Sequence, residues 1–273
     1  MGTTYLDLSY LQVLLAASLV VVNGILSLYL KLGMERLLFI SALRTVVQLL
    51  LIGFVLQWVF THNQWYLSLS IIVVMTVVAG YTAASRSQFH YPGMRLHSII
   101  SIWGSAWLVT GFAVFGILKL IPWYLPQYLI PLLGMVLGNS LNGVCLALER
   151  LSVELSTRKQ EVESQLALGA TRWEAAHPHL VTAIRTGMIN MTNAMMVVGL
   201  VSLPGMMTGQ LLAGVDPLEA VKYQIVIMFL IAATTMFGTI SVVLLGYRQM
   251  FNTAHQFIAP LPVIKTPARK WLK

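Results

Sequence analysis

The sequence predicts an all-α protein, a polytopic bundle of about seven transmembrane helices with its N-terminus outside and its C-terminus in the cytoplasm. Of its 273 residues, 58% are hydrophobic and only 10% are charged, whereas roughly a quarter of the residues in a soluble domain are charged. The apolar residues also come in long blocks, as membrane-spanning helices require. We therefore expect an integral membrane protein.

Seven apolar runs are long enough to cross a bilayer, which takes about 20 residues of helix. The predicted spans are residues 8–30, 37–60, 65–85, 98–118, 128–148, 188–212 and 223–247. They form a membrane domain, residues 1–247, which includes a cytoplasmic coupling segment, residues 149–187. A basic and irregular cytoplasmic tail, residues 248–273, follows.

The orientation follows from the basic residues, because cytoplasmic loops of membrane proteins are rich in Lys and Arg. With the N-terminus outside, 15 of the 17 Lys and Arg fall on the cytoplasmic side, and only Lys119 and Lys222 lie outside. This distribution explains the net charge of +8 without a nucleic-acid partner. The single Cys145 excludes a disulfide framework and a site built from several cysteines.

The polar segment 161–187 predicts two short helices at the membrane surface. The first, residues 161–168, ends at Gly169, which suits the left-handed residue after a helix. Thr171 then begins the second, and Glu174 three residues later completes a capping box. A rigid element of this kind can be pushed by another protein. The alternative is an ordinary amphipathic loop.

The same segment is similar to the EAA loop of ABC-transporter permeases, in the spacing of Glu163, Gly169-Ala170 and Trp173. In that family the loop docks into a groove on the ATPase subunit. The resemblance implies that the residues that couple this chain to an ATPase are Glu161, Glu163, Leu168, Gly169, Ala170, Thr171, Trp173 and Glu174.

Polar residues at bilayer depth predict a translocation pathway. In the fifth span, Gly134 and Gly138 form a GxxxG pair that favours close helix packing. Amides buried in a membrane must face the bundle interior or a wet cavity, and interhelical hydrogen bonding is the alternative role. The predicted pathway residues are Arg44, Gln48, Asn139, Asn142, Glu149, Asn190, Asn193, Pro204, Gly205 and Gln210.

Two further features of these spans lead to specific expectations. Pro204 should bend or break the sixth span, and broken helices line cavities in transporters. Arg44 and Glu149 lie near the cytoplasmic boundary, where a gate-like ion pair between them is an expectation from topology alone. Gln48 would share the face of Arg44, one turn away.

Metal ligands are few in this sequence. Met206 and Met207 offer soft thioether sulfurs, which suit Cu(I) better than hard cations. Methionine is also a common gap-filler in cores, which is the alternative role. The histidines show no metal spacing except His177 and His179, which flank a proline, and we expect these on the surface.

Several blocks resemble the Fet-type iron-export ABC permease family, which is related to plant aluminium-tolerance permeases. They are RTVVQLLLIG (44–53), GNSLNG with LALERL (138–151), LALGAT (166–171), AIRTGMIN (183–190) and GLVSLPGMMTGQLLAG (199–214). The resemblance implies two permeases and two ATPases in a bacterial inner membrane, exporting iron or a related metal. It implies no cofactor on this chain and ATP with Mg²⁺ on the partner.

The sequence lacks a GxxxxGK[ST] phosphate loop, so this chain is not expected to be the ATPase itself. An ion-coupled carrier or channel without an ATPase is the alternative function, but it needs a carboxylate at bilayer depth and none is central. An assembly or sensor protein that moves no solute is a third hypothesis.

Overall fold

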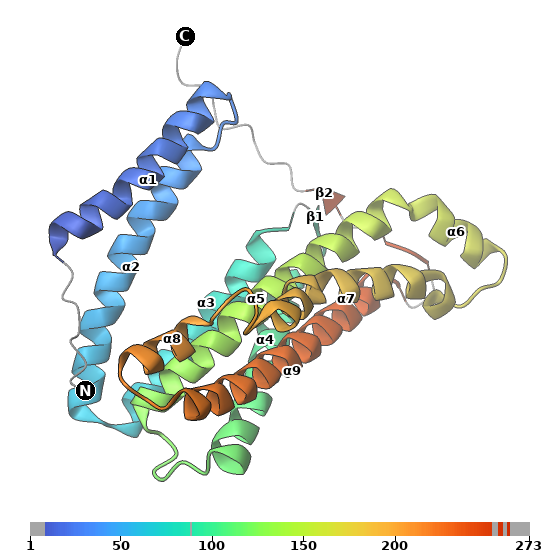
Figure 1. Cartoon of the computed structure of the whole chain (residues 1–273). Coiled ribbons are helices and arrows are strands. Elements are labelled where there is room, and N and C mark those ends of the chain that lie inside the picture. The colour runs from blue at the N-terminus through green and yellow to red at the C-terminus, as the bar shows by residue number, and fades with distance from the viewer. Residues whose placement is uncertain (1–8, 88, 253–255, 259–260, 263–273) are drawn as a thin grey trace.

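Three long helices, α5, α7 and α9, pack side by side at the centre of the computed structural model, which describes residues 9–87, 89–252, 256–258 and 261–262 (Figure 1). The helices are α1 (Tyr10–Tyr29), α2 (Glu35–His62), α3 (Trp65–Ser85), α4 (Met94–Gly111) with the π-helix η1 (Phe112–Ile117), α5 (Pro126–Thr157), α6 (Lys159–Ala167), α7 (Arg172–Val197), α8 (Gly205–Leu212) and α9 (Pro217–Gln249). Two short strands, β1 (Phe89–His90) and β2 (Leu261–Pro262), pair antiparallel.

The polytopic helical fold is confirmed, because six helices in the described part of the chain are long and apolar enough to cross a membrane. They are α1, α2, α3, α4 with η1, α5 and α9. The remaining predicted span, residues 188–212, is not one helix. It is divided between the end of α7, a connection and the short α8.

The sixth span is broken in the segment that precedes Pro204, and Pro204 predicted this break. Helix α7 ends at Val197, and Pro204 is the N-cap of α8. Proline has no backbone N–H to donate, and it is tolerated here because the first residues of a helix need no intrahelical donor. Gly199, with a φ of +83°, turns the chain between the two helices. The connection therefore replaces a continuous membrane span.

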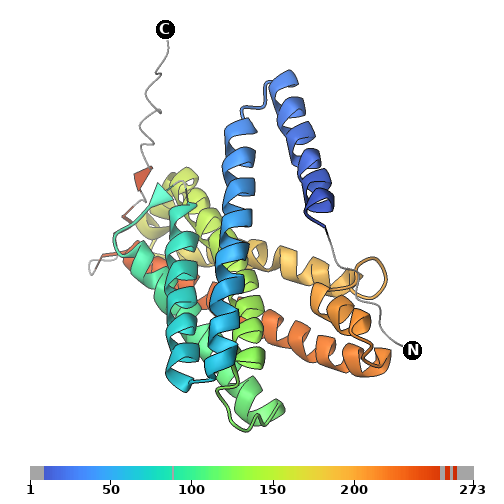
Figure 2. The same ribbon diagram turned by 90° about the vertical axis from the view of Figure 1, so that its left-hand side faces the viewer.

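Helices α1 and α2 form a hairpin that rises beside the bundle (Figure 2). Ser27 holds their turn, because its hydroxyl donates to the Glu35 carboxylate at 3.1 Å and accepts from the Met34 N–H at 3.1 Å. Within α2, Val59 is the buried residue. Most of the hairpin surface is thus available to lipid or to another protein.

Glycines of α5 and α7 pack closely against each other at the centre of the bundle. A Cβ atom added to Gly143 would lie 3.0 Å from the carbonyl oxygen of Gly187 and 2.4 Å from the Thr235 methyl of α9. A Cβ atom on Gly187 would meet the Gly143 carbonyl oxygen at 2.8 Å and the Thr239 methyl at 2.7 Å. The three central helices therefore meet at a point where no side chain fits.

The predicted GxxxG pair does not make this contact. A Cβ atom added to Gly138 would have no neighbour within 4 Å, and one on Gly134 would meet only the flexible end of Met75 at 3.3 Å. The close approach is made instead by Gly143, because the seam with α7 runs along a different face of α5. Within this chain the close approach on α5 is therefore made by Gly143 and not by the GxxxG pair.

Two of the central helices are longer than a membrane requires. Helix α5 has 32 residues and α9 has 33, which at 1.5 Å per residue gives about 48–50 Å against a hydrocarbon core of about 30 Å. Arg150 and Glu154 lie toward the end of α5 that leads into α6 (Figure 1), and we assign the surplus length to this charged end. This end holds the polar segment.

Most of the predicted irregular tail, residues 248–273, lies outside the described residues. Within the described part of the tail, Leu261 and Pro262 form β2, which pairs with β1.

Replacing Gly143 by alanine should lower stability by about 1–3 kcal/mol, because the new methyl group overpacks the seam between α5, α7 and α9. Thermal unfolding of the detergent-solubilised protein would measure the change. Gly104→Ala is the matched control, because a Cβ atom there has no neighbour within 4 Å. An equal loss of stability in both variants would contradict the role of the seam.

Candidate functional site

The polar segment folds as a tight turn between α6 and α7. Gly169 has a φ of +93°, and the N–H groups of Gly169 and Ala170 donate to the carbonyls of Leu166 and Gln165. This is the Schellman arrangement that ends helices at glycine. The predicted helix at residues 161–168 is confirmed as α6, which begins two residues earlier and ends one residue earlier.

The predicted capping box at the next helix is also present. The Thr171 N–H donates to the Glu174 carboxylate at 2.8 Å, and the Glu174 N–H donates to the Thr171 hydroxyl at 3.3 Å. The hydrogen bonds from Thr171 lower the pKa of Glu174, since they favour its charged form. The second helix is not short as predicted, because α7 continues for 26 residues and becomes a central helix of the bundle.

The tip of this turn presents an apolar side chain. Leu168 is 88% exposed, at the end of the molecule that extends beyond the membrane thickness. Glu161 and Glu163 are also exposed, and their partners are Arg158 at 3.3 Å and Lys159 at 3.5 Å. Leu168, Glu161 and Glu163 thus lie exposed on the polar segment that the sequence predicts to couple the chain to an ATPase.

Trp173 anchors the turn to the bundle. Its ring lies 5.1 Å from that of His177 and 5.7 Å, edge-on, from that of Tyr247 on α9, measured between centroids. Aromatic pairs in this geometry are favourable beyond the area they bury. Trp173 therefore connects the start of α7 to α9.

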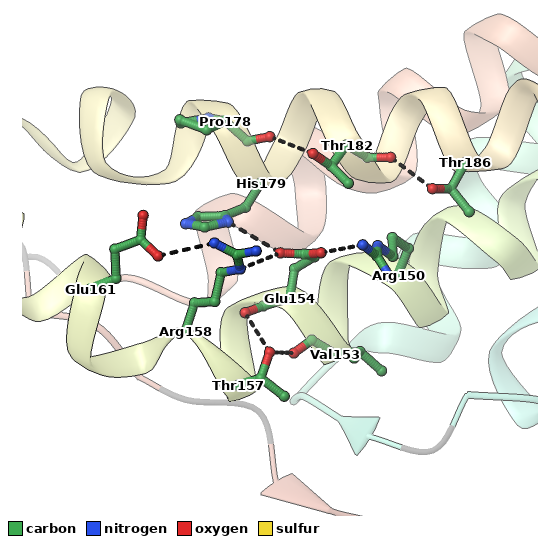
Figure 3. A network of polar contacts seen from close by, with 10 residues as sticks. All are labelled: Arg150, Val153, Glu154, Thr157, Arg158, Glu161, Pro178, His179, Thr182 and Thr186. Atoms are coloured by element: carbon green, nitrogen blue, oxygen red, sulfur yellow. Dashed lines mark hydrogen bonds and ion pairs between the residues drawn. The ribbon is translucent and has the colours of Figure 1, made fainter.

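A buried carboxylate joins the three elements around the turn (Figure 3). Glu154, near the end of α5, is only 6% exposed. It pairs with Arg150 on the same helix, and with Nε of Arg158 at 3.1 Å, where the chain enters α6. The ring of His179 on α7 approaches the same carboxylate through Nδ1 at 3.4 Å.

This network corrects the expectation for His179, which is buried and not on the surface. Pro178 does not separate it from α7, because the helix continues through the proline in its first turns. The network of Glu154 and its two arginines was not predicted from the sequence. The signal was available, since Arg150, Glu154 and Arg158 follow one another at four-residue steps and therefore share one helical face.

The predicted pathway amides are exposed on the central helices. Asn139 and Asn142 on α5 and Asn190 and Asn193 on α7 are all exposed in this single chain. Asn139 donates to the carbonyl of Met135 at 2.9 Å and keeps its side-chain oxygen available. Amides at bilayer depth are costly in contact with lipid, so this face requires water or a partner.

The predicted cytoplasmic gate is not formed within the described residues. Arg44 and Gln48 are exposed on α2, and no ion pair joins Arg44 to Glu149 there. Glu149 is half-buried on α5, near Cys145 and Arg86.

The residues of the broken span separate into two environments. Pro204, Gly205 and Met206 line one cavity, whereas Met207 lines a neighbouring one. Gln210 is half-buried, and its side-chain oxygen is buried without a hydrogen-bond partner. Across the described residues, His, Cys, Asp and Glu form no group of three or more that could hold a metal ion.

Comparison with known proteins places this fold in a family. Residues 10–251 match the uncharacterised protein family UPF0014, which is nearly the whole described chain. The chain belongs to the UPF0014 family. It is 42% identical over 215 residues to a UPF0014 membrane protein of Synechocystis, with 79% of this chain and 83% of the relative covered.

Two other UPF0014 relatives carry functional names. The probable iron export permease protein FetB of Escherichia coli is 32% identical, with 89% of this chain and 93% of the relative covered. The protein ALUMINUM SENSITIVE 3 of Arabidopsis thaliana is 33% identical, with 88% of each chain covered. No solved structure matches. The resemblance to the iron-export family is confirmed, and the chain is a member of a family of membrane permeases.

Replacing Glu154 by glutamine should destabilise the α5–α6–α7 junction by about 1–3 kcal/mol, because two arginines lose a charged acceptor that is buried. Thermal unfolding and proteolysis at the α6 end would measure the change. Glu163→Gln is the matched control, since its exposed pair with Lys159 is worth about 0–1 kcal/mol. Equal stability of the two variants would show that the buried network does not hold the junction.

Proposed function

We propose that this chain is the membrane subunit of an ABC transporter that exports iron or a related metal ion from the cytoplasm of a bacterium, across the inner membrane. A separate ATPase subunit binds ATP and Mg²⁺ and supplies the energy. The observation that carries the proposal is the α6–α7 turn, a capped and rigid element with an exposed leucine. The iron-export name of a relative that covers most of this chain supports the choice of substrate.

The ATPase docks on the turn in this proposal. Leu168 inserts into the groove of the partner, while the carboxylates of Glu161 and Glu163 surround it. Gly169 and Ala170 keep the turn tight, and Thr171 with Glu174 keeps the start of α7 helical. Because Glu154 joins α5, α6 and α7, movement of the turn moves two central helices together.

Two copies of the chain face each other through the exposed amides of α5 and α7. A second copy would cover Asn139, Asn142, Asn190 and Asn193 and would leave a polar route between the two chains for the substrate.

With the N-terminus outside, the turn between α6 and α7 lies in the cytoplasm, where ATP is available to the ATPase. The positive-inside distribution of Lys and Arg supports this orientation.

A carrier without an ATPase has less support. Such a carrier needs a carboxylate at bilayer depth, and the buried carboxylate of the described residues, Glu154, lies in the part of α5 that extends toward α6. There it is already paired with two arginines and a histidine.

Leu168→Ala should weaken binding of the ATPase by about 1–2 kcal/mol, because a central apolar contact is lost. Co-purification with the ATPase encoded in the native host, followed by ATPase assays in reconstituted vesicles, would measure this. Leu200→Ala is the matched control, because Leu200 is equally exposed, at 88%, but lies between α7 and α8. If no ATPase co-purifies with the chain in any preparation, the assignment to an ABC transporter is refuted.

Cysteines placed on the amide face should cross-link two copies of the chain. Each of the four asparagines is replaced singly by cysteine in a Cys145→Ser background and treated with a short bis-maleimide in native membranes. At least one variant should give a covalent dimer. Leu108→Cys, exposed on α4, is the control. Dimers from Leu108→Cys alone would place the interface elsewhere.

A further inference from the structure

A cavity of about 290 Å³ lies where α7 breaks before α8. Its walls come from α5, from the end of α7, from the connection and start of α8, and from α9. In Figure 1 this region is at the end of the bundle opposite α6. The cavity lies beside the amide face, because Asn139 is part of its lining.

Four methionines line this cavity, one from each of four helices. They are Met135 of α5, Met191 of α7, Met206 of α8 and Met228 of α9. These four belong to the hydrophobic core or pack against it, and they also border the open volume. Methionine side chains are flexible, so they can close around a small ligand.

A buried acceptor without a partner belongs to a residue that lines this cavity and the neighbouring one. Gln224 of α9 is 7% exposed, and its Oε1 atom has no hydrogen-bond partner. An unsatisfied buried acceptor costs about 1–3 kcal/mol, so a ligand that accepts electron density from this oxygen would be favoured. The available side-chain oxygen of Asn139 is a second neutral donor atom in the lining.

The charge of the lining selects the kind of ion. No Asp, Glu, His or Cys lines this cavity. Neutral thioethers and amide oxygens cannot balance a hard ion of high charge, whereas thioether sulfur is a preferred ligand of Cu(I). A singly charged soft ion also costs less to place at bilayer depth than a doubly or triply charged one.

We propose that the cavity lined by Met135, Met191, Met206 and Met228, with Gln224 and Asn139, binds a soft monovalent metal ion of the Cu(I) and Ag(I) class as the transported substrate. This inference rests on the proposed transport of iron or a related metal ion, and it names Cu(I) and Ag(I) as the related metal ions that this cavity would accept.

The test measures metal binding by the purified full-length chain in detergent. Cu(I) is added under reducing, anaerobic conditions in competition with a chromogenic Cu(I) chelator, and Ag(I) and Fe(II) are titrated separately. X-ray absorption of the Cu(I) form identifies the ligand atoms. One equivalent of Cu(I) bound through sulfur, with weaker binding of Fe(II), is the expected result. Because the assay contains no ATPase, it is independent of whether an ATPase partner exists.

Two adjacent residues provide a matched pair of variants. Met206→Leu keeps the side-chain volume but removes one thioether, and should lower Cu(I) affinity at least about tenfold, since even outer-shell partners are worth that much. Met207→Leu should leave the affinity unchanged, because Met207 does not line this cavity. It lines the neighbouring cavity, which shares Gln224 and Met228 with this one.

Three results would overturn the proposal: no bound Cu(I), tighter binding of Fe(II) than of Cu(I), or an equal loss of affinity in both variants. A folding defect in Met206→Leu would appear in thermal unfolding. In that case Met228→Leu, on the long helix α9, is tested in the same Cu(I) assay. The proposal requires that this variant also lose Cu(I) affinity, and an unchanged affinity would overturn it.

Discussion

The contact between Gly143 and Gly187 determines how the rest of the molecule is arranged. Because neither residue has a side chain, the backbones of α5 and α7 come close enough for a Cβ atom to meet the opposite carbonyl, and α9 closes the same point with Thr235 and Thr239. Without this seam the long helices would splay. The ends of α5 and α7 would then no longer present the α6 turn on one side and the broken helix on the other.

The two ends of the bundle have different chemistry for a physical reason. At the α6 end the helices extend past the thickness of the bilayer, so charged residues are tolerated, and Glu154 is stabilised by Arg150, Arg158 and His179. At the other end, the polar groups that line the cavity beside α8 are neutral, and thioethers and amides are among them. The same bundle thus combines an aqueous docking element with a neutral cavity.

Local patterns in the sequence predicted the features whose causes are local. Gly169 and the Thr171–Glu174 pair determine their turn within a few residues, and Pro204 stands at the start of α8, after the break that it predicted. Features that depend on which helical face meets which neighbour were predicted less well. Gly138 was expected to pack closely and does not. His179 was placed on the surface because the sequence does not show that Glu154 lies opposite it. The four methionines are far apart in the chain, so only the packing of four helices brings them to one cavity.

The unbroken length of α5 has a mechanical consequence. Met135 and Glu154 lie on the same helix, about 28 Å apart along its axis, and no proline interrupts the segment between them. A stiff rod of this kind converts a small tilt at one end into a displacement at the other. Information can therefore pass from the aqueous end to the membrane end as rigid-body motion, without a relay of side-chain rearrangements along the way.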